Sequence, residues 1–223
     1  MRSICKKGPA ILAGVMALCA LTAASASAAQ WYVGGKTLTG SEKLAETVKV
    51  EEAVVLAIKV GGEPPSKYPT ITCTTVKDSA TEIAAPAALK IKGLALGGCN
   101  LKVPGGEEKY CELQESNIDS SSLEGKLSAG TLSEDLTEIT PLGGTHEVFR
   151  TKIREGCVLL GGDELTIKGT TTLKSPQGKT EAAEQEFAGE GETGKGLTWD
   201  EQPVYLTGKL KLKLATGKAW SFH

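Results

Sequence analysis

The chain of 223 residues has few aromatic residues, two histidines and two methionines. Aromatic side chains make up only 4% of the sequence, so the core must be built mainly from valine, isoleucine, leucine and alanine. The near balance of 25 Lys and Arg against 27 Asp and Glu excludes the basic charge that drives nucleic-acid binding. Hydrophobic residues still reach 40%, which excludes a disordered polymer and predicts a folded protein.

The sequence also lacks an apolar run long enough to span a membrane. The apolar stretch from Pro9 to Leu21 is short, and it follows the positive charges of Arg2, Lys6 and Lys7. Small residues come next, which is typical of a secretory signal peptide, and we place its cleavage near Ala29. The mature protein is therefore expected to be secreted and extracellular, with no membrane span.

This division predicts a signal peptide at residues 1–29 and a single β-rich extracellular domain at residues 30–223. Removing the signal peptide leaves 22 basic against 27 acidic residues, a net charge of −5. About 194 residues are enough to bury a sizeable core without help from metals or partners.

Four cysteines remain after the signal peptide: Cys73, Cys99, Cys111 and Cys157. An even number in an exported chain predicts two disulfides, with four free thiols as the alternative. Four cysteines allow three pairings. We prefer Cys99–Cys111 and Cys73–Cys157, because a hairpin turn at residues 104–106 would bring the first pair face to face.

Apolar residues alternate with polar ones between glycine and proline breaks, which is typical of half-buried strands. The clearest run covers residues 204–214, where leucines and Gly208 share one face and three lysines share the other. We predict an all-β fold, either an antiparallel β-sandwich or a flattened barrel, of roughly eight to twelve strands. At most one or two short helices are expected, with residues 41–46 and 179–187 as the candidates.

An apolar residue, a variable residue and a glycine recur in the pattern that ends at Gly93, Gly125, Gly169 and Gly208. One interpretation is a repeated binding surface. We favour the other interpretation, in which the glycines mark bulges that bend the strands.

Two glycine and serine motifs resemble catalytic or nucleotide-binding sequences but lack essential parts. Residues 189–194 match the dinucleotide pattern, yet no strand and helix pattern flanks them, and Gly196 stands where a P-loop needs a hydroxyl. We therefore predict a surface loop there. The serine in residues 125–130 has the wrong spacing for a nucleophile elbow.

His146-Glu147 begins a near match to the zinc-protease motif, but Arg150 occupies the position of the second histidine. Arginine cannot bind zinc, and His146 is the only interior histidine available as a catalytic base. We assign no catalytic, cofactor or metal residue.

Adjacent acids occur at Glu51-Glu52, Glu107-Glu108, Glu134-Asp135 and Asp163-Glu164. A glycosidase needs two carboxyl groups on one site, but neighbours in a strand point to opposite faces. We interpret the acids as solvated charge, and Asp163-Glu164 as the best place for a weak calcium site that we do not predict.

Two further surface features have a functional and a structural interpretation. The lysine stripe at Lys209, Lys211 and Lys213 would suit an anionic polymer, but lysines on an exposed face more often block edge-to-edge aggregation. The aromatic residues Trp31-Tyr32, Trp199 and Trp220 would suit stacking on sugars, or equally would close the ends of the core.

Several short motifs are shared with a loose set of proteins: Trp31-Tyr32, Ile71-Thr72-Cys73, Gly98-Cys99, Cys111, Leu123-Glu124-Gly125-Lys126-Leu127, Gly156-Cys157 and the closing Trp220. In these features the chain resembles uncharacterised exported, four-cysteine, β-rich proteins of high-GC Gram-positive bacteria. The resemblance covers most of the mature chain. It implies an extracellular compartment and a β-rich fold, and it implies no activity.

We expect a non-enzymatic, disulfide-stabilised domain with a structural or binding role in the cell envelope or extracellular space. Its partner would be an envelope polymer or a protein, and no cofactor is expected. The first alternative is a barrel that carries a small apolar ligand. The second is a hydrolase that uses two unassigned carboxylates.

Overall fold

The computed structural model describes residues 29–78, 80–104, 111–128, 135–141, 146–154, 157, 164–175, 180–189 and 196–222. In these residues the chain forms β-strands and one short 3-10 turn, η1 (Pro65–Lys67). The prediction of an all-β fold is confirmed. Of the two predicted architectures, the closed barrel is the one that forms.

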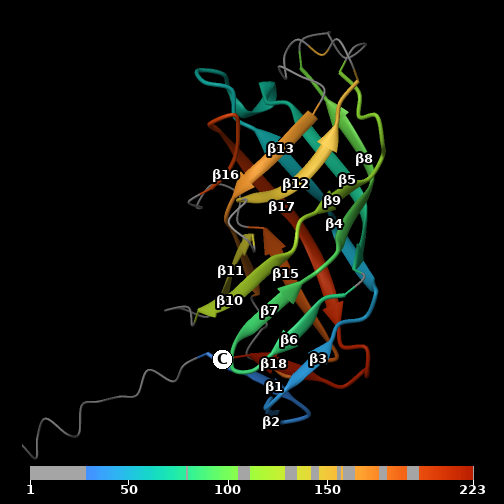
Figure 1. The fold of residues 1–223 in the computed structure, drawn as a ribbon, viewed down its shortest axis with the longest axis vertical. Helices are drawn as coiled ribbons and strands as arrows, with labels where there is room; N and C mark the ends of the chain where they lie inside the picture. Colours follow the sequence, from blue (N-terminus) through green and yellow to red (C-terminus); the bar gives the residue numbers. More distant parts are fainter. Residues whose placement is uncertain are drawn as a thin grey trace, which may run out of the picture.

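The barrel has eight strands, and seven of them are interrupted once and so carry two labels. In chain order they are β3 (Ser41–Lys43) with β4 (Thr47–Ile58), β5 (Thr70–Asp78) with β6 (Glu82–Ala84), β7 (Ala88–Ile91) with β8 (Leu94–Lys102), β9 (Ile118–Ser120) with β10 (Leu123–Ser128), β11 (Asp135–Pro141) with β12 (Glu147–Lys152), β13 (Glu164–Gly169) with β14 (Thr171–Ser175), β15 (Glu184–Gly189) with β16 (Leu197–Trp199), and the continuous β17 (Gln202–Lys213). Figure 1 shows them along the long axis of the molecule.

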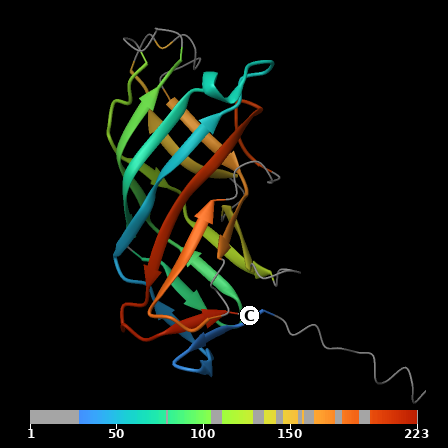
Figure 2. The ribbon, with the colours of Figure 1, turned by 180° about the vertical axis from the view of Figure 1, so that it is seen from behind.

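Each barrel strand pairs antiparallel with the strands before and after it in the chain. The ring closes because β17 pairs with β15 and β16 on one side and with β4 on the other. A bridge between Leu44 and Leu214 extends this last pairing to the lower end. Figure 2 shows β17, in red, along the side of the barrel. The topology is an up-and-down barrel, which leaves none of its main strands as an open edge.

The breaks between paired labels lie at neighbouring positions of adjacent strands, for example between β5 and β6 and between β7 and β8, and we call this level of the barrel the belt. In β4 the consecutive residues Glu51 and Glu52 are both exposed, and in β5 the same holds for Thr74 and Thr75. In β5 this changes the phase of the inward alternation, from Ile71 and Cys73 to Val76 and Asp78, whereas the buried residues of β4 keep one phase on both sides of Glu51-Glu52. We refer to the parts of the barrel on either side of the belt as its upper and lower halves, as oriented in Figure 1.

Gly169 and Gly208 lie at irregular positions, as the bulge interpretation predicts, whereas Gly125 of the same recurring pattern lies in the regular pairing of β10 with β7 and β11. Gly208 has a φ of +131° at a register shift between β17 and β4. Gly169, with a φ of +111°, ends β13 just before β14 begins, and a Cβ there would lie 2.4 Å from the carbonyl oxygen of Gly196. Both positions need a residue without a side chain.

The half of the barrel above the belt is a packed aliphatic core. Its inward-facing residues include Val54, Leu56 and Ile58 of β4, Ile167 of β13 and Val204 of β17, all of them buried. The alternation predicted from the sequence is therefore confirmed for these strands. Burial of each such side chain contributes about 1.5–3 kcal/mol to folding.

The lower end of the barrel is closed by a small three-stranded sheet made of β1 (Trp31–Val33), β2 (Lys36–Thr37) and β18 (Trp220–Phe222), in the order β18-β1-β2. Figure 1 shows these strands at the foot of the molecule. Trp31 and Phe222 pack edge to face at a centroid distance of 5.0 Å, and Phe187 stacks on Phe222 at 6.0 Å. Four aromatic residues, Trp31, Phe187, Trp220 and Phe222, thus pack together in this floor.

Both candidate helices were wrong. Residues 41–43 form strand β3, which pairs with β6, and residues 184–187 belong to β15, which pairs with β17. Each segment has only a short apolar pattern, so the hydrogen bonds of a neighbouring strand outweigh a weak helix preference.

The four cysteines form two disulfides as predicted, but the preferred pairing was wrong. The bonds are Cys73–Cys99 and Cys111–Cys157. Cys73 and Cys99 occupy directly opposite positions on the neighbouring strands β5 and β8.

The register of the β8–β9 pairing explains why Cys99 does not meet Cys111. The amide of Cys99 donates a hydrogen bond to the carbonyl of Ser116, so the returning chain places a later residue opposite Cys99. Cys111 instead begins a segment that runs beside the end of β12, where Leu113 bridges to Ile153. That segment brings Cys111 to Cys157.

Candidate functional site: an apolar cavity in the barrel

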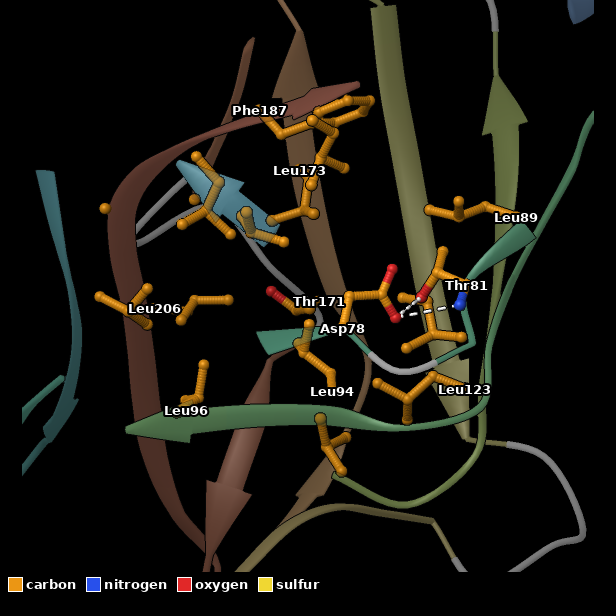
Figure 3. Close-up of a pocket in the computed structure, with 18 of the residues that line it drawn as sticks. Asp78, Thr81, Leu89, Leu94, Leu96, Leu123, Thr171, Leu173, Phe187 and Leu206 are labelled. Atoms are coloured by element: carbon orange, nitrogen blue, oxygen red, sulfur yellow. Dashed lines mark hydrogen bonds between the residues drawn. The ribbon is translucent and has the colours of Figure 1, made fainter. Parts of the chain in front are cut away.

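A cavity of about 80 Å³ lies inside the barrel, at the belt and in the half below it. Its lining comes from all eight barrel strands and includes Leu44, Val48, Asp78, Leu89, Ile91, Leu94, Leu96, Leu123, Val148, Thr171, Leu173, Phe187, Leu206, Leu210 and Leu212. Figure 3 shows these aliphatic side chains converging on a common space. A single water-sized sphere needs roughly 10–15 Å³ on this measure, so the cavity admits a short alkyl chain or one ring.

Several leucines on the cavity wall face inward without being fully buried. Leu206, Leu210 and Leu212 of β17 are half-buried, and so are Leu173 of β14 and Leu94 of β8. Leucines that point into a closed barrel are normally covered by neighbours. The residual exposure of these five means that an apolar guest would remove further apolar surface from water, which is favourable.

The alternating residues of β17 form a strand with the leucines on one face, as the sequence pattern predicted. Leu206, Gly208, Leu210 and Leu212 all line the cavity, and the lysines between them lie on the other face.

One carboxylate, that of Asp78, belongs to the cavity wall. Asp78 ends β5 and is only 3% exposed. Its Oδ1 accepts hydrogen bonds from the amide of Ala80 at 3.2 Å, the amide of Thr81 at 2.9 Å and the hydroxyl of Thr81 at 2.6 Å. These bonds fix the turn between β5 and β6. Figure 3 shows the second carboxylate oxygen pointing away from Thr81 and into the pocket.

A groove of about 1060 Å³ lies beside the cavity, along β4, β5, β8 and β9. Strands β4 and β5 are paired at Val48–Val76 and again at Val54–Cys73, with a register shift between these two points. Five residues of β4 therefore face two residues of β5, which is a bulge that disrupts the hydrogen-bond ladder locally. The groove and the cavity share three lining residues, Val48, Asp78 and Leu94.

The near match to a zinc-protease motif forms an ion pair on the surface. Arg150 donates hydrogen bonds to both carboxylate oxygens of Glu147, at 2.9 and 2.7 Å, and contacts Glu164 at 3.0 Å. The bonds to Glu147 raise the pKa of the Arg150 guanidinium. His146 precedes them in a left-handed conformation, with a φ of +55°. Among the described residues, no group of three histidine, cysteine or acidic side chains is placed to hold a metal ion.

The acid pair Glu51-Glu52 lies on the outside of the barrel and forms ion pairs with two lysines of the stripe, Lys209 and Lys211. Lys49 and Lys211 contact Glu51 at 2.5 and 3.3 Å, and Lys209 contacts Glu52 at 2.5 Å. The hydrogen bond that Lys49 donates, followed by that from Lys211, lowers the pKa of Glu51. Because β17 lies between β15 and β4, the lysines do not protect a sheet edge. That part of the interpretation was wrong.

The tryptophans were expected either to stack on sugars or to close the ends of the core. Trp31 and Trp220 are fully buried in the floor, so they close the core and do not form a sugar platform. The Trp31 indole donates a hydrogen bond to the carbonyl of Ala88 at 2.9 Å. Trp199 is half-buried beside the polar turn Asp200-Glu201.

Several sequence motifs lie outside the described residues. They are Glu107-Glu108, Glu134, Asp163, residues 129–130 of the serine motif and residues 190–195 of the glycine-rich loop. The expected signal peptide, up to residue 28, also lies outside them. The described part of the chain contains no helix long and apolar enough to cross a membrane.

An interior site was expected only in the alternative of a ligand-carrying barrel, and neither Asp78 nor the other lining residues were assigned to it. Nothing in the sequence distinguishes Asp78 from the other acids, although its position at the end of an alternating strand, on the inward phase, is a weak signal. Comparison with known proteins adds no assignment, because no family model, curated protein or solved structure matches this chain.

Proposed function

We propose that this protein is an exported, non-catalytic binding protein that carries a small apolar ligand inside its barrel. The observation that carries the proposal is the aliphatic cavity, whose walls come from all eight barrel strands. Closed eight-stranded barrels have an interior of the right size to hold one small ligand. Small-molecule sites in proteins are also mostly apolar with few polar groups, as this cavity is.

The half-buried leucines support a carrier over a purely structural domain. A structural β-domain gains stability by filling its interior to crystal-like density. Here Leu173, Leu206 and Leu210 keep accessible surface on the inside of the barrel. A ligand that covers them gains about 25 cal/mol for each Å² of apolar surface that it buries.

The described acidic pairs give no support to the hydrolase alternative. Glu51 and Glu52 lie on the outer surface, each within ion-pair distance of a lysine, and Glu147 and Glu164 share Arg150. The cavity wall contains one carboxylate, whereas glycoside hydrolysis by acid catalysis uses two.

Export is supported by the two disulfides and by the composition of residues 1–29. Disulfides form and persist in oxidising compartments.

The same two disulfides also stabilise the fold. In the chain-entropy model the bonds Cys73–Cys99 and Cys111–Cys157, with sequence separations of 26 and 46, contribute about 3.5 and 4 kcal/mol.

The proposal is tested by measuring the uptake of xenon and of hexane with two opposite variants of one cavity residue. Leu173→Trp fills the cavity and should abolish uptake, whereas Leu173→Ala enlarges it and should increase uptake. Val60→Phe, at an exposed position, is the control for a larger side chain and should leave uptake unchanged. Xenon NMR and thermal shift measure the binding. Equal uptake by all four proteins, or none by the wild type, contradicts the proposal.

A further inference from the structure

We infer that the ligand is a small cationic amphiphile, an alkyl or aryl amine, whose ammonium group binds Asp78 while its apolar part fills the cavity. This inference rests on the proposed function and adds the chemical class of the ligand and its orientation. It depends on three observations: the position of the Asp78 carboxylate, the charges of the groove, and the residues that the groove shares with the cavity.

The first step is the position of the Asp78 carboxylate. The three hydrogen bonds from Ala80 and Thr81 all end on Oδ1, and the other oxygen points into the pocket. An ionised carboxylate accepts about four hydrogen bonds and donates none. In an aliphatic cavity, the partner that best compensates such a group is a donor with a positive charge.

The second step is the charge of the groove. Three carboxylates and one ammonium group line it, on Glu46, Asp78, Asp119 and Lys77. The excess of negative charge attracts a cation and repels a carboxylate of the same size. The remaining lining residues are small or apolar, which gives an amphiphile a surface for its uncharged part.

The third step is the continuity between groove and cavity. Val48, Asp78 and Leu94 line both spaces, so Asp78 stands at their boundary. Leu94 lies directly opposite Asp78 in the β5–β8 pairing. An ammonium group at this boundary reaches Asp78 from the groove, while an attached chain of a few carbons extends among the half-buried leucines. The register shift between β4 and β5 lies close to this boundary, beside the lining of the groove.

The test compares three ligands of equal chain length: hexylamine, hexan-1-ol and hexanoate. Isothermal titration calorimetry on the disulfide-bonded protein at neutral pH measures their affinities, because an alkylamine is protonated there, as lysine is. We expect hexylamine to bind about tenfold or more tightly than hexan-1-ol, and hexanoate to bind most weakly.

Two variants separate the role of Asp78 from the general charge of the groove. Asp78→Asn keeps an oxygen that can accept the bonds from Thr81, so the turn is retained while the charge is lost. It should reduce hexylamine affinity to that of hexan-1-ol and leave hexan-1-ol binding unchanged. Asp119→Asn is the matched control on the groove surface, and it should weaken hexylamine binding only slightly and only at low salt.

The outcomes distinguish this inference from the proposed function. If hexylamine and hexan-1-ol bind wild type and Asp78→Asn equally, the amine assignment is wrong and the carrier proposal stands. If neither they nor xenon bind, both fail. If Asp78→Asn does not fold, the three affinities of the wild-type protein still test the inference. Tightest binding of hexylamine supports the amine assignment, and tighter binding of hexan-1-ol or hexanoate overturns it.

Discussion

Gly208 of β17 lies directly against Ala53 of β4, and no side chain fits between them. A Cβ at position 208 would stand 2.8 Å from the carbonyl oxygen of Ala53 and 2.9 Å from the Cα of Val54. Gly208 also has a φ of +131°, which other residues rarely adopt. This contact sets the bulge at which the last barrel strand meets the first.

Replacing Gly208 with alanine should therefore destabilise the protein by at least about 2 kcal/mol, through backbone strain and displacement of β4. Urea unfolding measures the change. Gly40→Ala is the matched control, since a Cβ there meets nothing within 4 Å and no left-handed φ is required. Similar stability of the two variants would show that the close contact does not constrain the barrel.

The hairpin between β16 and β17 turns through two residues with positive φ, Asp200 at 44° and Glu201 at 66°. Two-residue hairpins with this geometry favour glycine, especially at the second position. Glu201→Gly should raise the stability by about 0.5–1 kcal/mol, because glycine avoids most of the left-handed strain. Thermal unfolding measures it. Glu63→Gly, in the loop between β4 and β5, is the control and should not be stabilising.

Glu51 gives the stability a defined dependence on pH. Its pKa in the folded protein is lower than the ordinary value of 4.5, because Lys49 and Lys211 donate hydrogen bonds to it. The ion pairs therefore contribute fully to the stability of the fold at pH values above 4.5, the ordinary pKa. This contribution to stability is lost as the pH falls through the lowered pKa of the folded protein.

Glu51→Gln should accordingly lose less stability than the wild type between about pH 7 and about pH 3. The difference should shrink at high salt, since the group is exposed. Urea unfolding at both pH values measures it, with Glu63→Gln as the control outside the cluster. An unchanged pH profile in Glu51→Gln would show that these ion pairs do not contribute.

The disulfide pairing makes a direct prediction for peptide mapping. Digestion without reduction should yield one cross-linked peptide pair containing Cys73 and Cys99 and another containing Cys111 and Cys157. Replacing Cys111 and Cys157 together by alanine should cost up to about 4 kcal/mol, because a loop with a separation of 46 residues is released in the unfolded chain. Recovery of a Cys99–Cys111 peptide would contradict the structure.

The alternation of apolar residues was sufficient to predict the strands and the β class. It succeeded best in β4 and β17, where Val54, Leu56 and Leu210 each face inward. The recurring glycine pattern also located the bends at Gly169 and Gly208, because a glycine inside a strand pattern requires a local reason. The apolar alternation and the glycine pattern can each be recognised within a single strand, without knowing which strands are neighbours.

The features that sequence analysis missed depend on how distant strands align. Whether Cys99 meets Cys73 or Cys111 is decided by the β5–β8 and β8–β9 registers, which local patterns do not specify. Asp78 becomes part of a cavity only because the barrel closes around it. The short segment at residues 41–43 adopts a strand because β6 supplies its hydrogen-bond partners.

The floor of the barrel is contributed by β1 and β18, the first and the last strands that the structure describes. Trp31 and Trp220 come from β1 and β18, which pair along their whole length. The lower end of the barrel is thus covered only when both strands are in place. The pairing joins two segments that lie far apart in the sequence, so loss of either strand would expose the aromatic side chains that the other covers.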